Sequence, residues 1–172
     1  MAKGKNKPAE KTNAMRRLDA LKIQYGQHYY DGEEALSGTE VAAVLGQDPG
    51  QCFKTLVTVG KTGEHYVFMV PVAAELDLKK AAKAVGEKSV EMIKSKELLP
   101  LTGYIHGGCS PIGMKKFFKT TIHRTAEDYD VIFFSGGRIG FQIELGTGDL
   151  VRAIDFQLAD IVKEDETGNE NY

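Results

Sequence analysis

Runs of β-branched and aromatic residues separated by glycine-containing turns dominate the middle of the chain. Residues 52–59 and 65–72 form two such runs, and the glycine-bounded segment 60–63 between them is typical of a hairpin turn. The second run is apolar at odd and even positions alike, as in a central strand. In residues 139–145 apolar and polar side chains alternate, which predicts a half-buried strand that pairs with residues 130–134 across a glycine turn.

Helical patterns are confined to short segments that carry their own end signals. Ser37 and Glu40 have the spacing of a capping box, and Gly46 can end the helix that they begin. Further helices are predicted near residues 13–21, 78–85 and 147–154, with Thr147 as the cap of the last. Successive hairpins and short, scattered helices indicate an α+β fold. We expect a mixed, mainly antiparallel β-sheet that curls toward a barrel, surrounded by short helices.

Length and composition fit one globular domain. The chain has 172 residues, 42% hydrophobic and 27% charged, which is enough to bury a real core. We expect a single domain over residues 12–163, between a disordered basic tail at 1–11 and an acidic tail at 164–172. The net charge of −2 gives no overall sign of nucleic-acid binding, so any RNA contact needs a local basic patch. Two basic clusters are usually just solvated faces, but they would serve as phosphate contacts if they flank one groove. They are Lys79, Lys80 and Lys83, and Lys115, Lys116, Lys119 and Arg124.

The two cysteines, the N-terminal residues and the lack of long apolar runs indicate a reducing compartment. The N-terminal residues are basic and polar and lack the apolar stretch of a signal peptide. No run approaches the length of a membrane span, so we expect a cytoplasmic location and no membrane partner. Cys52 and Cys109 match no disulfide framework or paired metal motif and are interpreted as small buried hydrophobic residues. The four histidines are too scattered for a metal site, and we expect neither metal nor cofactor.

Two glycine clusters are candidates for a binding site. Residues 103–113 contain a Gly-Gly pair, a proline and a closing glycine, and residues 135–140 contain three glycines. Because glycine has no Cβ, such loops can turn sharply and leave backbone N–H groups free for an oxyanion or a phosphate. The plainer interpretation of either cluster is a tight surface turn. Two clusters on either side of a short basic segment favour a site.

Lys54 is the sharpest single candidate, because it lies within an apolar run. Its side chain either extends to solvent at the end of a strand or points into a cleft, where the ammonium could hold a carbonyl or phosphate oxygen. Tyr30 and His28 lie two residues apart and could face the same way, although a packed ring is the commoner role of such a tyrosine. The sequence leaves these alternatives open.

Familiar catalytic motifs are absent from the sequence. Residues 60–62 match the end of a Walker loop, but Thr55 stands where that loop requires its first glycine. The chain contains neither the HExxH pattern of zinc proteases nor the GxSxG elbow of serine hydrolases. A classical triad or a metal mechanism therefore has no support.

Four segments in a fixed order carry a family resemblance. They are Cys-Phe-Lys-Thr-Leu-Val at 52–57, Leu-Asp-Leu-Lys-Lys at 76–80, Thr-Gly-Tyr at 102–104 with Gly-Gly-Cys-Ser-Pro-Ile-Gly at 107–113, and Ser-Gly-Gly-Arg-Ile-Gly at 135–140 with Ile-Glu-Leu at 143–145. In these the chain resembles the YbaK/EbsC family of aminoacyl-tRNA deacylases, related to the editing domain inserted in bacterial prolyl-tRNA synthetases. The likeness spans roughly residues 14–163.

The resemblance implies a trans-editing hydrolase that deacylates mischarged Cys-tRNA(Pro) without a metal. Lys54 matches the lysine on which activity in the family depends, and Tyr30 matches a tyrosine near the substrate. Gln142, where some members carry an acidic residue, is expected to bear on amino-acid specificity. The family's two glycine loops lie near the substrate, which predicts substrate contacts at Gly107, Gly108, Ser135, Gly136 and Gly137.

The resemblance also implies a reaction without an enzyme nucleophile. The thiol of the cysteinyl group is proposed to attack its own ester carbonyl, while the protein positions both. We therefore expect Lys54 and the backbone N–H of Gly107 or Gly108 to fix the ester carbonyl and the 3′ adenosine. The expected partners are the aminoacyl-tRNA and a prolyl-tRNA synthetase, which would raise the local substrate concentration.

Two other functions stay open. An editing deacylase for Ala-tRNA(Pro) would keep the fold but would need water as the attacking group, so dependence on the substrate thiol separates it from the first hypothesis. A non-catalytic tRNA- or synthetase-binding module would bind without hydrolysis. The presence of Lys54 and both glycine loops argues against that module.

Overall fold

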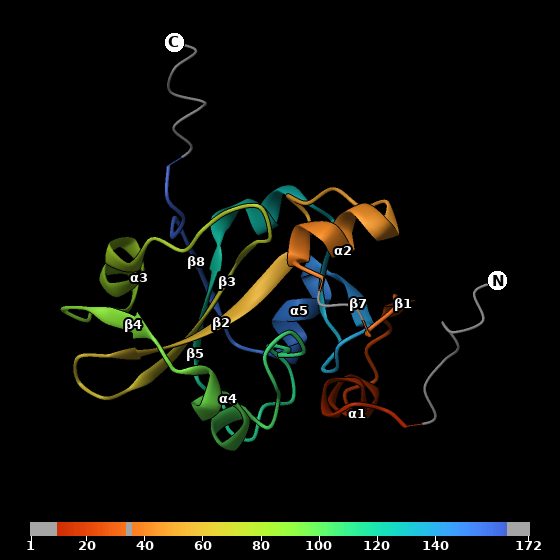
Figure 1. Cartoon of the computed structure of the whole chain (residues 1–172), viewed down its shortest axis with the longest axis horizontal. Helices are drawn as coiled ribbons and strands as arrows, with labels where there is room; N and C mark the ends of the chain where they lie inside the picture. The colour runs from red at the N-terminus through yellow and green to blue at the C-terminus, as the bar shows by residue number, and fades with distance from the viewer. Residues whose placement is uncertain (1–9, 34–35, 165–172) are drawn as a thin grey trace, which may run out of the picture.

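The strands of the protein form two sheets, seen in Figure 1, in a computed structural model that describes residues 10–33 and 36–164. The five strands of the larger sheet are, in order, β4 (Val90–Met92), β2 (Phe53–Gly60), β3 (His65–Pro71), β5 (Lys119–His123) and β8 (Gln157–Ala159). The three strands of the smaller sheet are β1 (Gly26–Tyr29), β7 (Phe141–Gly146) and β6 (Val131–Ser135). The predicted hairpins are confirmed, since β2 pairs with β3 and β6 pairs with β7, both antiparallel.

The α+β class and the mainly antiparallel pairing are confirmed, but the barrel-like curl is wrong. Only the β3–β5 and β5–β8 pairs are parallel among the described strands. The outer strands β4 and β8 of the larger sheet do not pair with each other, and the two sheets touch through an isolated bridge between Cys52 and Phe133. The alternation of apolar and polar residues along a strand shows which side chains share a face of the sheet, but not which strands lie beside it. The sequence pattern therefore could not distinguish one curled sheet from two open sheets.

Five α-helices surround the sheets within the described residues, and the end signals read from the sequence are largely confirmed. Thr12 and Ser37 accept hydrogen bonds at the starts of their helices, and Ser37 forms the predicted capping box with Glu40. Thr147 does not cap its helix: Gly146 is the capping residue, and the Thr147 hydroxyl donates to the Tyr129 carbonyl instead. The helices are α1 (Asn13–Ala20), α2 (Gly38–Leu45), α3 (Leu78–Val85), α4 (Ser95–Thr102) and α5 (Thr147–Ala153).

The core lies on both faces of the larger sheet, because successive side chains of β3 point in opposite directions. Met69 packs with Leu18 of α1, Ile143 of β7 and other buried residues between the two sheets. Phe68 on the opposite face packs with Ala81 of α3. Full burial of a side chain of this size contributes about 1.5–3 kcal/mol, so these two layers fix β2 and β3 as a rigid support.

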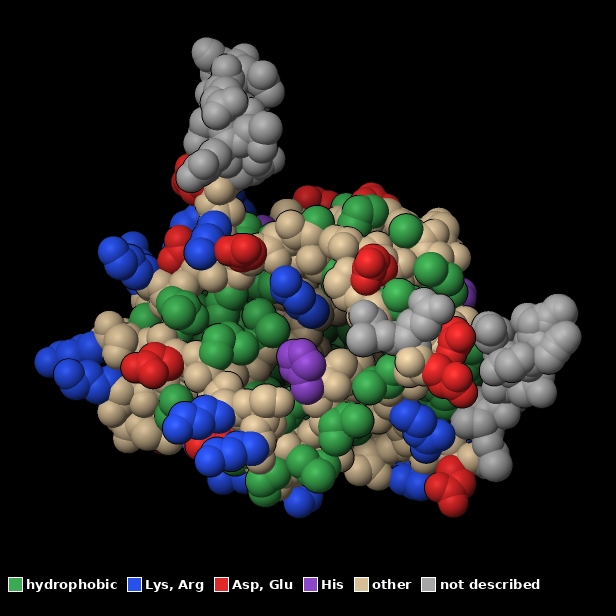
Figure 2. All heavy atoms as spheres, in the orientation of Figure 1, with side chains coloured by type: hydrophobic (Ala, Val, Ile, Leu, Met, Phe, Trp, Pro, Cys, Tyr) green, Lys and Arg blue, Asp and Glu red, His purple; other side chains and the backbone are tan. Residues whose placement is uncertain are grey.

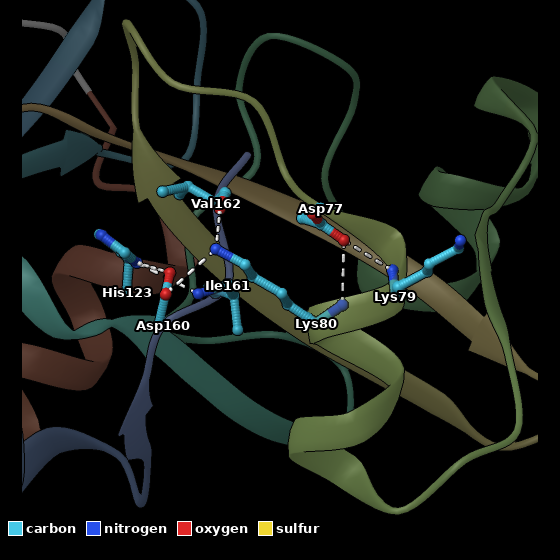
Figure 3. A network of polar contacts seen from close by, with 7 residues as sticks. All are labelled: Asp77, Lys79, Lys80, His123, Asp160, Ile161 and Val162. Carbon is cyan, nitrogen blue, oxygen red and sulfur yellow. Dashed lines mark hydrogen bonds and ion pairs between the residues drawn. The ribbon is translucent and has the colours of Figure 1, made fainter. Parts of the chain in front are cut away.

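A polar network attaches the C-terminal segment to the edge of the larger sheet, as Figure 3 shows. We call Lys80, His123, Asp160, Ile161 and Val162 the C-terminal anchor. Lys80 Nζ donates to Asp160 Oδ2 at 3.0 Å and to the Val162 carbonyl at 2.8 Å. The Ile161 N–H donates to His123 Nδ1 at 3.3 Å. Each charged group of the anchor therefore has a partner within the protein.

The predicted tails fall largely outside the described part of the chain. This holds for residues 1–9 of the basic tail and residues 165–172 of the acidic tail. Lys11 is described, and its ammonium contacts the Asp19 carboxylate on α1. Among the helices that the structure describes, none is long and apolar enough to cross a membrane.

Candidate functional site

A cleft of about 320 Å³ lies against β2. Its walls come from the start of α2, the residues that lead into α4, the first glycine cluster and the β6–β7 hairpin. Figure 2 shows hydrophobic side chains gathered over β2, with cationic and histidine side chains beside them. Five of the eight predicted site residues line the cleft, and three do not. Those that line it are Tyr30, Lys54, Gly107, Ser135 and Gln142.

Lys54 lies near the start of β2, opposite Val70 of β3, and lines the cleft. Of the two alternatives left by the sequence, the structure therefore favours the cleft. Burial lowers the pKa of its ammonium, and the charge of Glu75 opposes this shift. No described residue accepts a hydrogen bond from Nζ. The neighbouring Thr55 hydroxyl is also buried without a hydrogen-bond partner among the described residues.

The charge of the cleft suits an anion. Among its described lining residues, Lys54, Lys94 and His106 are basic, and none is acidic. The remaining lining is largely apolar, which lowers the local dielectric and strengthens the attraction between an ammonium and a carbonyl or phosphate oxygen. A small ester with a nearby phosphate matches this combination.

The first glycine cluster offers a donor at Gly107. Gly107 is exposed, lines the cleft and has a φ of 87°, which disfavours a residue with a Cβ. Its N–H has no acceptor among the described residues. The Gly108 N–H is already used, because it donates to the Ile105 carbonyl at 2.9 Å. Of the two donors proposed from the sequence, Gly107 is therefore the one left for a substrate.

Glycine is required at position 108 because the two glycine clusters pack closely there. A Cβ at Gly108 would lie 3.0 Å from the Ile139 nitrogen and 3.1 Å from Arg138 Cα. Contacts this short with backbone atoms leave little room for a larger residue. A substrate contact at Gly108 stays a prediction, because Gly108 is not among the residues that line the cleft.

Ser135 of the second glycine cluster lines the cleft, whereas Gly136 and Gly137 make contacts within the protein. Ser135 Oγ accepts a hydrogen bond from the Gly137 N–H at 3.1 Å, and the Gly136 N–H donates to the Phe141 carbonyl at 3.0 Å. A Cβ at Gly137 would lie 3.0 Å from the Tyr104 ring. Gly136 and Gly137 do not line the cleft, so their predicted substrate contacts also stay predictions.

Gln142 is held by a residue that the sequence analysis missed. Gln47 and Gln142 exchange two hydrogen bonds: Gln47 Nε2 donates to Gln142 Oε1 at 2.7 Å, and Gln142 Nε2 donates to Gln47 Oε1 at 2.8 Å. The Cys52 thiol also donates to Gln47 Oε1, at 3.2 Å. Gln47 follows the end of α2 and lies 95 residues from Gln142 along the chain, so no local pattern could have paired them.

The two cysteines line the cleft but are poor nucleophiles. Burial raises the pKa of the Cys52 thiol to about 11 and that of the Cys109 thiol to about 12. Both are therefore protonated near neutral pH, and the thiolate is the reactive form. Among the described residues, no group of three or more His, Cys, Asp or Glu side chains is arranged to hold a metal ion.

Fold and cleft together describe an α+β protein whose cleft is lined by basic residues and, among those described, by no acidic one. Residues 33–153 match the model of the aminoacyl-tRNA editing domain, and the chain belongs to this family, which confirms the resemblance found in the sequence. EbsC of Enterococcus faecalis, a protein with an inferred Cys-tRNA(Pro)/Cys-tRNA(Cys) deacylase activity, is 46% identical over 158 residues, which cover 91% of this chain and 96% of that protein.

Two solved structures have the same fold. One, described as an inferred trans-editing enzyme for prolyl-tRNA synthetase, is 25% identical with a TM-score of 0.78 and covers 91% of this chain and 100% of its own. The other, a hypothetical protein, is 22% identical with a TM-score of 0.79 and covers 88% of this chain and 99% of its own. The second supports the fold alone.

Proposed function

We propose that this chain is a trans-editing deacylase that removes cysteine from mischarged Cys-tRNA(Pro). The family and the 46% identical relative with an inferred Cys-tRNA deacylase activity support the reaction class. The observation that carries the proposal is the Lys54 ammonium, half-buried in a cleft without an acidic lining residue among those described. An ammonium in this setting is free to bind the ester or phosphate oxygens of a charged tRNA end.

In the proposed complex, Lys54 and the Gly107 N–H hold the ester carbonyl and the 3′ adenosine. The Gln142 side-chain oxygen accepts one hydrogen bond from Gln47 and has a second lone pair, which is suited to the α-ammonium of the amino acid. Tyr30 and Ser135, which also line the cleft, contact the aminoacyl group. The glycines 108, 136 and 137 support these contacts through the positions of their loops.

The substrate thiol is the proposed nucleophile. Its sulfur forms a bond to the ester carbonyl carbon, the bond from that carbon to the 3′ oxygen breaks, and the thiol proton passes to the 3′ oxygen. The products are free tRNA and a cysteine thiolactone, which water then opens to cysteine. Favourable positioning of groups within one molecule lowers a barrier by about 7–11 kcal/mol, so the protein needs no nucleophile of its own.

The experiment compares release of the amino acid from Cys-tRNA(Pro), Ala-tRNA(Pro) and Ser-tRNA(Pro) by the wild type and the Lys54→Ala variant. We expect rapid loss of cysteine alone, abolished by the substitution. Equal loss of alanine would instead assign the water-dependent reaction. Binding of all three without turnover would assign the non-catalytic binding module and refute the proposal.

A second variant tests the absence of an enzyme nucleophile. Replacement of Cys52 and Cys109 by serine together should leave the deacylation rate near that of the wild type, because neither thiol ionises near neutral pH. A loss of more than about a hundredfold, or ~2.7 kcal/mol, in a folded double variant would show that a protein thiol takes part.

The wider setting follows from the same proposal. A prolyl-tRNA synthetase is the expected partner, since it releases the mischarged tRNA and association would raise the local concentration of substrate. We propose the cytoplasm as the location, where translation supplies the substrate. Residues 12–163 are proposed to act as one domain.

A further inference from the structure

A second hollow, of about 560 Å³, lies apart from the cleft and shares no lining residue with it. We call it the basic groove. Its walls are Arg17 on α1, the segment at 113–118 between α4 and β5, and the end of α5 with the residues that follow it. In Figure 1 this segment runs on from α4, in green to teal.

The basic groove carries a local positive charge that the overall charge of −2 conceals. Arg17, Lys115, Lys116 and Arg152 line it, against one acidic residue, Asp155. Arg152 is paired with Asp149 at 3.2 Å, but in the described part of the chain no carboxylate pairs with the other three cations. Three exposed, unneutralised cations around one hollow attract a polyanion.

An aromatic side chain stands in the same groove. Phe117 is 57% exposed although it is large and apolar. The next residue, Phe118, is buried, and Lys116 Nζ lies 5.6 Å from the centre of its ring. A base can stack on an exposed ring while neighbouring lysines contact the phosphates, and this combination is typical of surfaces that bind nucleic-acid strands.

We propose that the basic groove binds the sugar–phosphate backbone of the tRNA whose aminoacyl end occupies the cleft. Lys115, Lys116 and Arg17 contact phosphates, and Phe117 stacks on a base or ribose. This inference rests on the proposed function for the identity of the RNA. A protein partner fits less well, because the centres of protein–protein interfaces are depleted in charged residues.

The connection between the two hollows supports a single ligand. The first glycine cluster contributes Gly107 and Cys109 to the cleft and Pro111 and Gly113 to the basic groove. Cys109 of the cleft and Pro111 of the basic groove are two residues apart, so these parts of the two linings lie within about 7 Å of each other. An RNA seated in the basic groove is therefore held beside the site at which its 3′ end reacts.

The test uses a Lys115→Ala/Lys116→Ala double variant and a Phe117→Ala variant. The matched control is Lys79→Ala/Lys83→Ala, which removes the same charge from exposed positions of α3 outside both hollows. Hydrolysis is measured for Cys-tRNA(Pro) and for the cysteinyl ester of adenosine, which has no phosphate backbone. Binding of uncharged tRNA is measured by fluorescence anisotropy over a range of salt concentrations.

We expect kcat/KM for Cys-tRNA(Pro) to fall at least tenfold in the groove variants through a higher KM, with hydrolysis of the adenosine ester unchanged. The double variant should reduce the slope of log K against log salt by about 2, one for each lysine that no longer binds a phosphate. The control should match the wild type in both assays. Equal losses in the control, unchanged tRNA binding or a parallel loss on the adenosine ester would overturn the proposal, and unchanged tRNA binding would point to a protein partner.

Failure of the proposed function gives a different result. If the wild type hydrolyses neither substrate, the deacylase hypothesis fails, but the binding measurement still decides the basic groove. Weaker tRNA binding in the groove variants and not in the control supports the groove even then. Equal binding by all variants rejects it.

Discussion

Lys54 in the cleft and Lys80 in the C-terminal anchor are both partly buried lysines, but their surroundings differ. Lys80 Nζ donates to Asp160 at 3.0 Å and to the Val162 carbonyl at 2.8 Å. Lys54 Nζ has no hydrogen-bond acceptor among the described residues, and burial lowers the pKa of its ammonium. A buried charge without a partner costs stability. The difference indicates that Lys80 stabilises the fold and that Lys54 is available to a ligand.

The largest predicted effect comes from Lys54→Met, which keeps most of the side-chain length and removes the charge. We expect kcat/KM for Cys-tRNA(Pro) to fall at least about a hundredfold, or ~2.7 kcal/mol, because the ester loses its cation. The free energy of unfolding should stay within about 0.5 kcal/mol of the wild-type value or rise, since the substitution removes a half-buried ammonium with no hydrogen-bond acceptor among the described residues. Kinetics and urea unfolding of the same protein sample measure both. A loss of stability as large as the loss of activity would contradict the assignment of Lys54 to ligand binding rather than to the stability of the fold.

The reverse pattern is expected for Lys80→Met. Loss of the hydrogen bonds to Asp160 and Val162 should lower the free energy of unfolding by about 1–2 kcal/mol, a range that allows for the partial exposure of the pair. Deacylation by the folded protein should stay within about twofold of the wild-type rate, since a change far from the site adds little to the barrier. A large loss of activity at unchanged stability would show that the anchor is coupled to the cleft.

A smaller effect is expected for the amide pair that supports the cleft. Gln47→Ala should lower kcat/KM about five- to tenfold, because Gln142 loses the partner that orients its side chain. The coupling in a double-mutant cycle with Gln142→Ala should be about 1 kcal/mol. Additive effects of the two substitutions would mean that Gln47 acts only on stability, which urea unfolding of the four proteins would reveal.

The comparison also shows which features the sequence could predict. Ser37 with Glu40, Gly46 and the hairpin turn at 60–63 each depend on neighbours within a few residues, and the structure confirms them. Lys54 was recognisable because a charge within an apolar run is unusual. The pairing of Gln47 with Gln142 and the attachment of Lys80 to Asp160 join positions 95 and 80 residues apart, and no local pattern encodes them.

The glycine clusters show a second limit of the sequence. Glycine is required both where a backbone N–H is offered to a ligand and where two loops pack closely, and the residue type is the same in either case. Gly107 fits the first situation and Gly108 the second, although they are adjacent. The predicted barrel failed for a related reason, because the order of strands in a sheet depends on contacts between distant segments.

The smallest predicted effect is the pH dependence of the C-terminal anchor. Burial holds the pKa of His123 below its usual value of 6.5, with the charges of Arg124 and Lys80 acting in the same direction and Asp160 opposing them. The folded protein therefore favours the neutral ring, whose Nδ1 accepts from the Ile161 N–H. This contribution to stability is complete above the unfolded pKa and is lost as the pH falls through the folded one.

Urea unfolding of the wild type and of His123→Asn between pH 8 and pH 5 tests this dependence. Asparagine keeps an acceptor near the Ile161 N–H but does not titrate, so the variant should lose less stability over this range. His28, His65 and His106 are present in both proteins, so their contributions cancel in the comparison. If the free energy of unfolding of the two proteins changes equally with pH, the charge state of His123 does not contribute to the stability of the anchor.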